Sequence, residues 1–390
     1  MKKLLTRTNL YYFLFLFVFT LITLEISGRV YYLVLQRSSQ RKFRFNSYRI
    51  YEHVPGFHEG DGKKDWIIIN RQGFRRAADV TKQKQQNTFR VFLMGGSAAH
   101  GVSSAAPYPI VHIYEDQTID AYLERKLKQL HPDHNIEIIN VAEEGYQVFQ
   151  HTTYILSELL DYHPDMIIFF DGVNDHYFNN PNLDYWGDNP YQFWKSRLQT
   201  PSVGGCFDYF FLWLSRFSGF GKGVYMRRLS NDATSHYKRQ TIKYSDPESA
   251  IAAHKIIARK SFLRAIEANI NILKTNNIQP VICLQPVLTL RDSSMYPIQE
   301  KSFYEKKYAN AIGKDYQVLY PTVLKELTDL TGQYQVPLIN MVIPFNDPAY
   351  KGKQLFIDAV HLSPLGGEVV ADNLLQAVDS VWVKSFSGGQ

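Results

Sequence analysis

The stretch from Phe89 to Gly101, FRVFLMGGSAAHG, constrains the fold more than any other part of the chain. Four apolar residues in a row, Val91 to Met94, are typical of a strand that is buried on both faces, as in a parallel sheet. Two glycines then allow a tight turn at the carboxyl end of this strand, and Ser97 follows at once. Ligands of open α/β sheets bind beyond the carboxyl ends of the strands, so Ser97 is a candidate nucleophile. The alternatives are an N-cap of the next helix or a phosphate-binding turn.

The composition is that of a globular protein with room for a large core. The chain has 390 residues, of which 45% are hydrophobic and 21% charged. The net charge is +6, but the basic residues do not form the pattern with aromatic residues that is typical of nucleic-acid binding, so we expect no nucleic-acid partner. Only two cysteines occur, Cys206 and Cys283, which indicates neither a disulfide framework nor a Cys-rich zinc site. Cys283 lies in an apolar run and is expected in the core.

The N-terminus carries a basic head, residues 1–9, and then a long apolar segment, residues 10–35. A single tilted membrane helix could contain all of residues 10–35, with Glu25 and Arg29 paired at i,i+4 spacing. A cleaved signal peptide is the alternative, but Ile26-Ser27-Gly28 makes a poor cleavage site. The sequence therefore favours an uncleaved, single-pass anchor that contacts membrane lipids.

The basic residues on the two sides of this segment favour opposite orientations in the membrane. The head carries three positive charges, which favour its retention in the cytoplasm, whereas a second basic cluster lies between Arg37 and Arg49. Because so short and basic a head is hard to export, we expect it inside and residues 36–390 outside the cytoplasm. The second cluster would then lie on anionic lipid headgroups.

Residues 36–88 are expected to form a small β-rich preamble and linker, and an α/β pattern begins at residue 89. The predicted strands are Val91–Met94, Ile136–Val141, Met166–Phe170, Val281–Leu284 and Val336–Met341. Helical periodicity separates them, and a last helix begins at Pro364. This alternation predicts a parallel sheet in a domain that spans residues 89–384. Residues 177–245 are too long for an ordinary loop and form an aromatic insertion.

Polar residues follow three of the predicted strands and precede the last helix. Ser97, Gly145 and Asn174 lie in the strand-end turns, and Asp358 and His361 precede the helix. A parallel sheet brings such turns to one edge. Acyl transfer needs a serine that attacks, a histidine that takes its proton and a carboxylate that orients the imidazole. It also needs donors for the oxyanion, which the N–H groups of Ser97 and Gly145 and the Asn174 amide could supply.

Four blocks of this sequence resemble those of the SGNH hydrolases, also called GDSL lipases/esterases. They are Gly95-Gly96-Ser97, Gly145, Gly172-Val173-Asn174-Asp175 and Asp358-Ala359-Val360-His361, in this order within residues 90–384. The resemblance implies a flavodoxin-like three-layer α/β/α fold with five parallel strands. It implies that Ser97 is the nucleophile and first oxyanion donor, with Gly145 and Asn174 as second and third donors. His361 would be the general base and Asp358 its partner, and we expect no metal or other cofactor.

The sequence departs from the family pattern in two places. The family has Gly-Asp-Ser where this chain has Gly95-Gly96-Ser97, so an aspartate that usually braces the turn is missing. Glu143 and Glu144 precede the oxyanion glycine, and their negative charge would oppose an oxyanion unless they point away.

These observations predict a membrane-anchored serine esterase of SGNH type that cleaves an acyl ester, such as an acetyl ester, of a glycan or lipid. An O-acyltransferase that passes the acyl group to a sugar hydroxyl would use the same residues. A catalytically inactive glycan-binding protein on the same fold is a further alternative. A metal-dependent hydrolase is another, whose ligands would be Asp171, Asp175, His176, Asp358 and His361.

The insertion is the expected source of substrate contacts. In its first half, polar residues interleave with aromatic rings, which suits a loop that stacks on sugars or lines an acyl pocket. We therefore predict that Tyr185, Trp186 and Trp194 line the substrate cleft near Ser97. A small core of the insertion's own is the alternative, and it is favoured for Phe207 to Phe217, whose apolar density needs burial against the domain or the bilayer surface.

Overall fold

The computed structural model describes residues 7–38, 42–104, 108–177, 210–211, 213–215, 217–221, 223–224, 262–305 and 307–387. The chain divides into two compact units, one of Met1–Lys42 with Asp184–Thr241, the other of Phe43–Leu183 with Ile242–Gln390. The predicted substrate contacts Tyr185, Trp186 and Trp194 lie outside the described residues.

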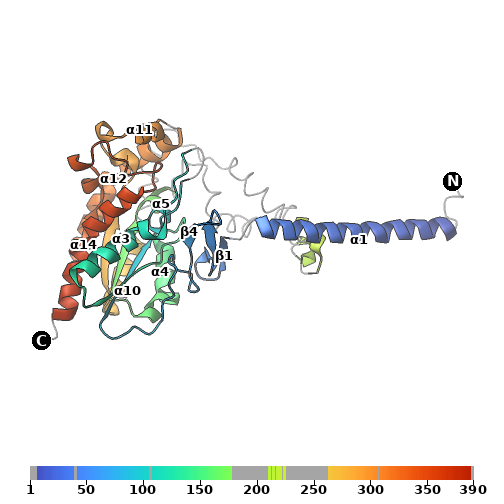
Figure 1. Ribbon diagram of the computed structural model, residues 1–390, viewed down its shortest axis with the longest axis horizontal. Coiled ribbons are helices and arrows are strands. Elements are labelled where there is room, and N and C mark those ends of the chain that lie inside the picture. Colours follow the sequence, from blue (N-terminus) through green and yellow to red (C-terminus); the bar gives the residue numbers. More distant parts are fainter. Residues whose placement is uncertain are drawn as a thin grey trace. The chain divides into compact units, whose positions relative to one another are not determined.

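The first unit contains helix α1 (Arg7–Ser38), in which Asn9–Val30 is long and apolar enough to cross a membrane (Figure 1). The expected ion pair is present, with Arg29 Nε 2.8 Å from a carboxylate oxygen of Glu25. Glu25 also accepts hydrogen bonds from the Ser218 hydroxyl at 2.7 Å and the Gly219 N–H at 2.8 Å. The carboxylate inside the apolar segment is therefore fully engaged by donors of the same unit.

The second unit is built on a five-stranded parallel sheet whose strand order is β6-β5-β7-β8-β9. The strands are β5 (Thr88–Gly95), β6 (Asn135–Asn140), β7 (Met166–Asp171), β8 (Gln279–Leu284) and β9 (Leu338–Asn340). This is the flavodoxin-like order, in which the second strand along the chain lies on the outer side of the first. The predicted fold class is therefore confirmed.

Successive side chains of each strand point to opposite faces of the sheet, and both faces are buried because helices pack on each of them. One face, which includes Leu93 and Ile168, packs under α3 (Ile119–Leu130) and α14 (Pro364–Ser387). The other face, which includes Phe169, packs under three helices (Figure 1). They are α4 (Val148–Ser157), α10 (Arg264–Thr275) and α12 (Lys307–Tyr334). The three layers explain why the strands read as continuous apolar runs.

Shorter elements complete the unit. The short helices are α2 (Ser97–His100), α5 (Val173–Tyr177), α11 (Ile298–Tyr304) and α13 (Val342–Phe345). Strand β9 is shorter than the predicted Val336–Met341, since α12 continues to Tyr334 and α13 begins at Val342. Cys283 is buried in β8, as expected.

Two antiparallel hairpins precede β5, in agreement with the expected β-rich segment. Strand β1 (Phe43–Asn46) pairs with β2 (Ile50–His53), and β3 (His58–Gly60) pairs with β4 (Asp65–Ile68). The Asn46 side chain closes the first hairpin because its oxygen accepts the N–H groups of Tyr48 and Arg49, each at 2.9 Å. Both belong to the same unit as the parallel sheet.

The packing of the sheet predicts the cost of a cavity. Ile168→Ala removes a side chain that is fully buried in β7 and should lower the free energy of unfolding by about 2–5 kcal/mol. Leu156→Ala on α4 is the matched control, because that side chain is 57% exposed and its loss should change stability by less than about 0.5 kcal/mol. Urea unfolding followed by circular dichroism measures both, and equal effects would contradict the described packing.

Candidate active site

The candidate site lies at the carboxyl edge of the parallel sheet, where strand order reverses. Ser97 follows β5, Gly145 lies in the loop after β6, and Asn174 follows β7. Strands β5 and β7 are neighbours, although the chain forms β6 between them. In this fold, the switch point between these two strands is where ligands bind.

The turn before Ser97 leaves no room for a side chain at Gly95, and a side chain at Gly96 would displace the Asn174 amide from its present position. A Cβ at Gly95 would lie 2.5 Å from the Phe170 carbonyl oxygen. A Cβ at Gly96 would lie 2.2 Å from Nδ2 of Asn174. Gly96, which replaces the aspartate of the family pattern, thus leaves the space that the Asn174 amide occupies. Ser97 then begins α2, where its own N–H has no partner within the helix.

A continuous hydrogen-bonded relay joins Asp358, His361 and Ser97. Nε2 of His361 is 2.8 Å from Oγ of Ser97, and Nδ1 of His361 is 2.6 Å from Oδ2 of Asp358. The other oxygen, Oδ1 of Asp358, accepts the N–H groups of Val360 and His361, both at 2.8 Å. The carboxylate thus holds the proton of His361 on Nδ1, which leaves Nε2 as the acceptor for the serine hydroxyl.

The loop that carries Asp358 and His361 is itself closed. An antiparallel bridge joins Phe356 to Leu362, and the Ile357 N–H donates to the His361 carbonyl at 2.9 Å. Asp358 and His361, three residues apart, therefore lie on a short turn that is closed by backbone hydrogen bonds, and not on one face of a helix.

The charges around His361 favour its protonated form. Burial opposes the imidazolium, but the adjacent Asp358 carboxylate and the charge of Glu144 together raise the pKa of His361 above its ordinary value. Burial likewise opposes the Asp358 carboxylate, but His361 and the two backbone N–H groups lower the pKa of Asp358. Both shifts stabilise the ion pair that forms once the serine has given up its proton.

The three predicted oxyanion donors come from loops that touch. Nδ2 of Asn174 donates to the Tyr146 carbonyl at 2.9 Å, and its second hydrogen remains for another acceptor. Gly145 has φ +77°, which favours glycine, and its N–H has no hydrogen-bond partner among the described residues. Together with the N–H of Ser97, these donors form an arrangement that can accept a developing negative charge.

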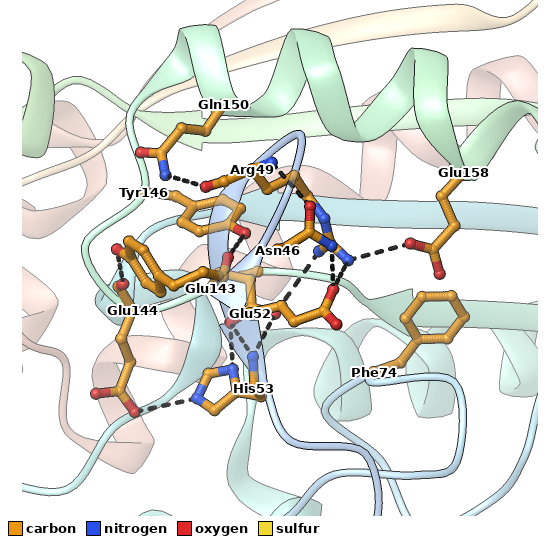
Figure 2. A network of polar contacts seen from close by, with 12 residues as sticks. Asn46, Arg49, Glu52, His53, Phe74, Glu143, Glu144, Tyr146, Gln150 and Glu158 are labelled. Carbon is orange, nitrogen blue, oxygen red and sulfur yellow. Dashed lines mark hydrogen bonds and ion pairs between the residues drawn. The ribbon is translucent and has the colours of Figure 1, made fainter. Parts of the chain in front are cut away.

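The two glutamates before Gly145 are drawn toward the β1–β2 hairpin. The buried Glu143 carboxylate accepts the backbone N–H of His53 with both oxygens at 3.2 Å and also pairs with the His53 ring (Figure 2). Arg49 Nη1 lies 3.8 Å from Oε1 of Glu143, and Nε2 of His53 lies 3.6 Å from Oε1 of Glu144. Burial opposes a charged His53, but the two glutamates raise the pKa of His53 to about 9. The protonated His53 thus offsets part of their negative charge at neutral pH.

One group of side chains among the described residues has metal-ligand chemistry, but its geometry suits an ion poorly. Ligand atoms of His53, His100 and Glu144 lie within 4.8 Å of one another. The two imidazoles stack at 4.6 Å between ring centroids with an interplanar angle of 16°. An ion lies in the plane of each ring that ligates it, and stacked rings do not share such a point.

The metal ligands considered from the sequence make other contacts. His361 bonds to both Asp358 and Ser97, and His176 Nδ1 bonds to the Gly172 carbonyl. Asp171 accepts from His151 at 3.0 Å. These contacts favour the serine chemistry over the metal-dependent alternative.

The sequence does not reveal the role of the β1–β2 hairpin at this site. Its residues Arg49, Tyr51 and His53 contact the loop around Gly145, which lies about 90 residues further along the chain. Their alternation in the sequence indicates a strand but gives no sign of its partner.

No family model and no curated protein matches this sequence. Its structure is similar to those of several solved proteins at low sequence identity. An acetyl xylan esterase matches with a TM-score of 0.39 and 15% identity, over 74% of this chain and 100% of that one. A putative GDSL-like lipase from Parabacteroides merdae matches with a TM-score of 0.39 and 14% identity, over 75% and 95%. A lipase/acylhydrolase from Enterococcus faecalis matches with a TM-score of 0.38 and 12% identity, over 75% and 96%. The fold class rests on the strand order given above.

The charge of Glu144 predicts a shift in the pH dependence of ester cleavage. The base must be neutral, so kcat/KM should fall as pH drops through the raised pKa of His361, which lies above about 6.5. Glu144→Gln removes a charge that raises this pKa and should move the acid limb of the pH profile to lower pH. Asp329→Asn, an exposed residue of α12 paired with Lys325, is the control and should leave the limb in place. An unmoved limb in Glu144→Gln would argue against this electrostatic coupling.

Proposed function

We propose that this protein is a membrane-anchored serine esterase of SGNH type that cleaves an acyl ester of a glycan or lipid. The observation that carries the proposal is the relay from Asp358 through His361 to Ser97, with 2.6 Å and 2.8 Å contacts, beside the Asn174 amide. A catalytically inactive binding protein would have no need of a base aligned on a serine hydroxyl.

The proposed reaction proceeds in two steps through an acyl-enzyme. Oγ of Ser97 attacks the acyl carbon while its proton passes to Nε2 of His361. The oxyanion accepts hydrogen bonds from the N–H groups of Ser97 and Gly145 and from the Asn174 amide, each worth about 3–4 kcal/mol of barrier. The intermediate collapses, and the leaving alcohol takes the proton from His361. Water, activated by the same histidine, then releases the acid; a sugar hydroxyl in its place would give acyl transfer.

The proposed anchor is α1, with the catalytic domain outside the cytoplasm. The apolar length of Asn9–Val30 and the basic head before it support this topology. The helical fragment after residue 209 adds exposed rings of Phe210, Trp213 and Phe217 to the unit that contains α1. Aromatic rings beside an apolar helix suit the membrane interface. Tyr185, Trp186 and Trp194 are proposed to contact the substrate.

Removal of the nucleophile tests the proposal. Ser97→Ala should abolish ester cleavage, measured with p-nitrophenyl esters and acetylated glycans, together with covalent labelling by a fluorophosphonate. Ser302→Ala, on α11, is the control and should retain both activities.

His361→Ala should be nearly as damaging as Ser97→Ala, and the variant that combines both changes should be little worse than either. Asp358→Asn should be less damaging than either single change. Turnover that persists in Ser97→Ala would exclude the serine mechanism, and acylated sugar products would assign the protein as a transferase.

The proposed topology is tested by labelling of single cysteines in intact cells. In a Cys206→Ser background, Gln83→Cys should react with a membrane-impermeant maleimide before lysis, because residues 79–86 would face outward. Thr6→Cys in the basic head is the matched control, and we expect it to react only after lysis. The opposite pair of results would reverse the orientation.

A further inference from the structure

We propose that the β1–β2 hairpin completes the oxyanion hole and that Tyr51 is a positioning residue, which acts through the peptide group between Glu144 and Gly145. This inference rests on the proposed function, because it assigns a role within the same site. It gives the β1–β2 hairpin, which the sequence suggested was only a segment preceding the domain, a role in the proposed chemistry at Ser97.

The hydrogen bond of the Tyr51 hydroxyl fixes the direction of the Gly145 N–H. The phenol donates to the carbonyl oxygen of Glu144 at 2.6 Å. That carbonyl and the N–H of Gly145 belong to one peptide group, which is planar. In a trans peptide, the C=O and the N–H point to opposite sides, so a donor that holds the carbonyl on the hairpin side directs the N–H away from the hairpin. The direction of an oxyanion donor thus depends on a side chain of β2.

Packing holds the phenol in place. Tyr51 is 5% exposed, and its ring packs edge-on against Tyr146 at 5.2 Å and Phe43 at 5.6 Å. A Cβ at position 145 would lie 2.8 Å from the Tyr51 hydroxyl oxygen. Gly145 is therefore required twice, by its positive φ and by this approach.

The hydroxyl also remains a donor over the working range of an esterase. Burial, and then the negative charges of Glu143 and Glu144, raise the pKa of Tyr51 well above its usual range. A carbonyl that accepts a hydrogen bond polarises its own peptide group, which strengthens the N–H on the other side. Tyr51 thus supports both the direction and the donor strength of Gly145.

Further bonds hold the hairpin against both sides of Gly145. The Tyr146 hydroxyl donates to the Tyr51 carbonyl. The His53 N–H donates to Glu143 (Figure 2). Nε2 of Gln150, in the first turn of α4, donates to the Arg49 carbonyl at 3.0 Å. The loop therefore rests on the hairpin through residues before and after the oxyanion glycine.

The kinetic test is Tyr51→Phe, which removes the hydroxyl and keeps the buried ring. Oxyanion donors act on charge that develops in the transition state, so the loss should appear in kcat and not in KM. We expect kcat to fall by about 10- to 100-fold, somewhat less than loss of the donor itself, and KM to change by less than about threefold. Tyr334→Phe is the matched control, because it removes a hydroxyl that donates to Glu267 at 2.8 Å. Tyr334 precedes the amino end of β9, whereas the site lies at the carboxyl ends of the strands, so kcat should be unchanged.

A second measurement follows the peptide group without any need for activity. The sequence contains two Glu-Gly pairs, Glu59-Gly60 and Glu144-Gly145. Full-length protein in detergent, with ¹³C at the glutamate carbonyl and ¹⁵N in glycine, therefore gives two carbonyl–amide cross peaks. Tyr51→Phe should shift the Glu144-Gly145 peak and leave the Glu59-Gly60 peak in place, while Tyr334→Phe should shift neither.

The outcomes separate this inference from the proposed function. A shifted peak together with reduced kcat and unchanged KM supports the role of Tyr51. An unmoved peak, or wild-type kcat in Tyr51→Phe, overturns it even if Ser97 proves essential. If Ser97→Ala retained full turnover, the proposed function would fail, whereas the cross peaks would still decide whether Tyr51 orients the peptide.

Discussion

The buried carboxylate of Glu143 is the point on which the arrangement of the site depends. A buried charge costs several kcal/mol unless it is paired, and here both partners, His53 and Arg49, come from the β1–β2 hairpin. Arg49 in turn also reaches Glu158 beyond the end of α4 at 3.1 Å and lies over the ring of Tyr154 at 3.6 Å. If the hairpin separated from the loop, Glu143 would lose its partners and Arg49 and His53 would lose theirs, so buried charges of both signs would be unpaired. The segment that precedes the sheet is thereby fixed to the loop that carries Gly145.

The sheet supplies the other half of the site through its topology. Because β5 and β7 are adjacent, Ser97 and Asn174 are brought together by pairing alone, and two glycines let them approach. The proposed base, His361, comes from the far end of the chain on a closed turn before α14. The proposed nucleophile, oxyanion donors and base thus lie on separate elements, each held by burial or by backbone hydrogen bonds, and preorganised catalysis would need this rigidity.

The fold and the proximity of Ser97, His361 and Asp358 were predictable from the sequence, whereas the surroundings of the Gly145 loop were not. Apolar runs identify strands such as β5, and the polar residues at their ends imply a common edge. The sequence cannot tell where a glutamate side chain points, so Glu143 and Glu144 looked adverse to an oxyanion. Their compensation by His53 joins residues about 90 positions apart through a four-residue strand. No local pattern encodes such a contact, because periodicity reports which face is buried and not what it meets.

The two imidazoles near the Gly145 loop both have raised pKa values, but the protonated form of His53 supports the loop, whereas the proposed role of His361 needs its neutral form. The pKa of His53 is raised to about 9, so the stability that its charge contributes is fully present below about 6.5 and is lost as pH rises through about 9. As the proposed base, His361 would have to lose its proton, and Glu144, which contacts His53, also raises the pKa of His361. The same carboxylate therefore helps to hold the loop and would lower the activity of the proposed esterase at low pH. The negative charge beside Gly145 thus has a structural role in the contact with the hairpin, and under the proposed mechanism it would also shift activity to higher pH.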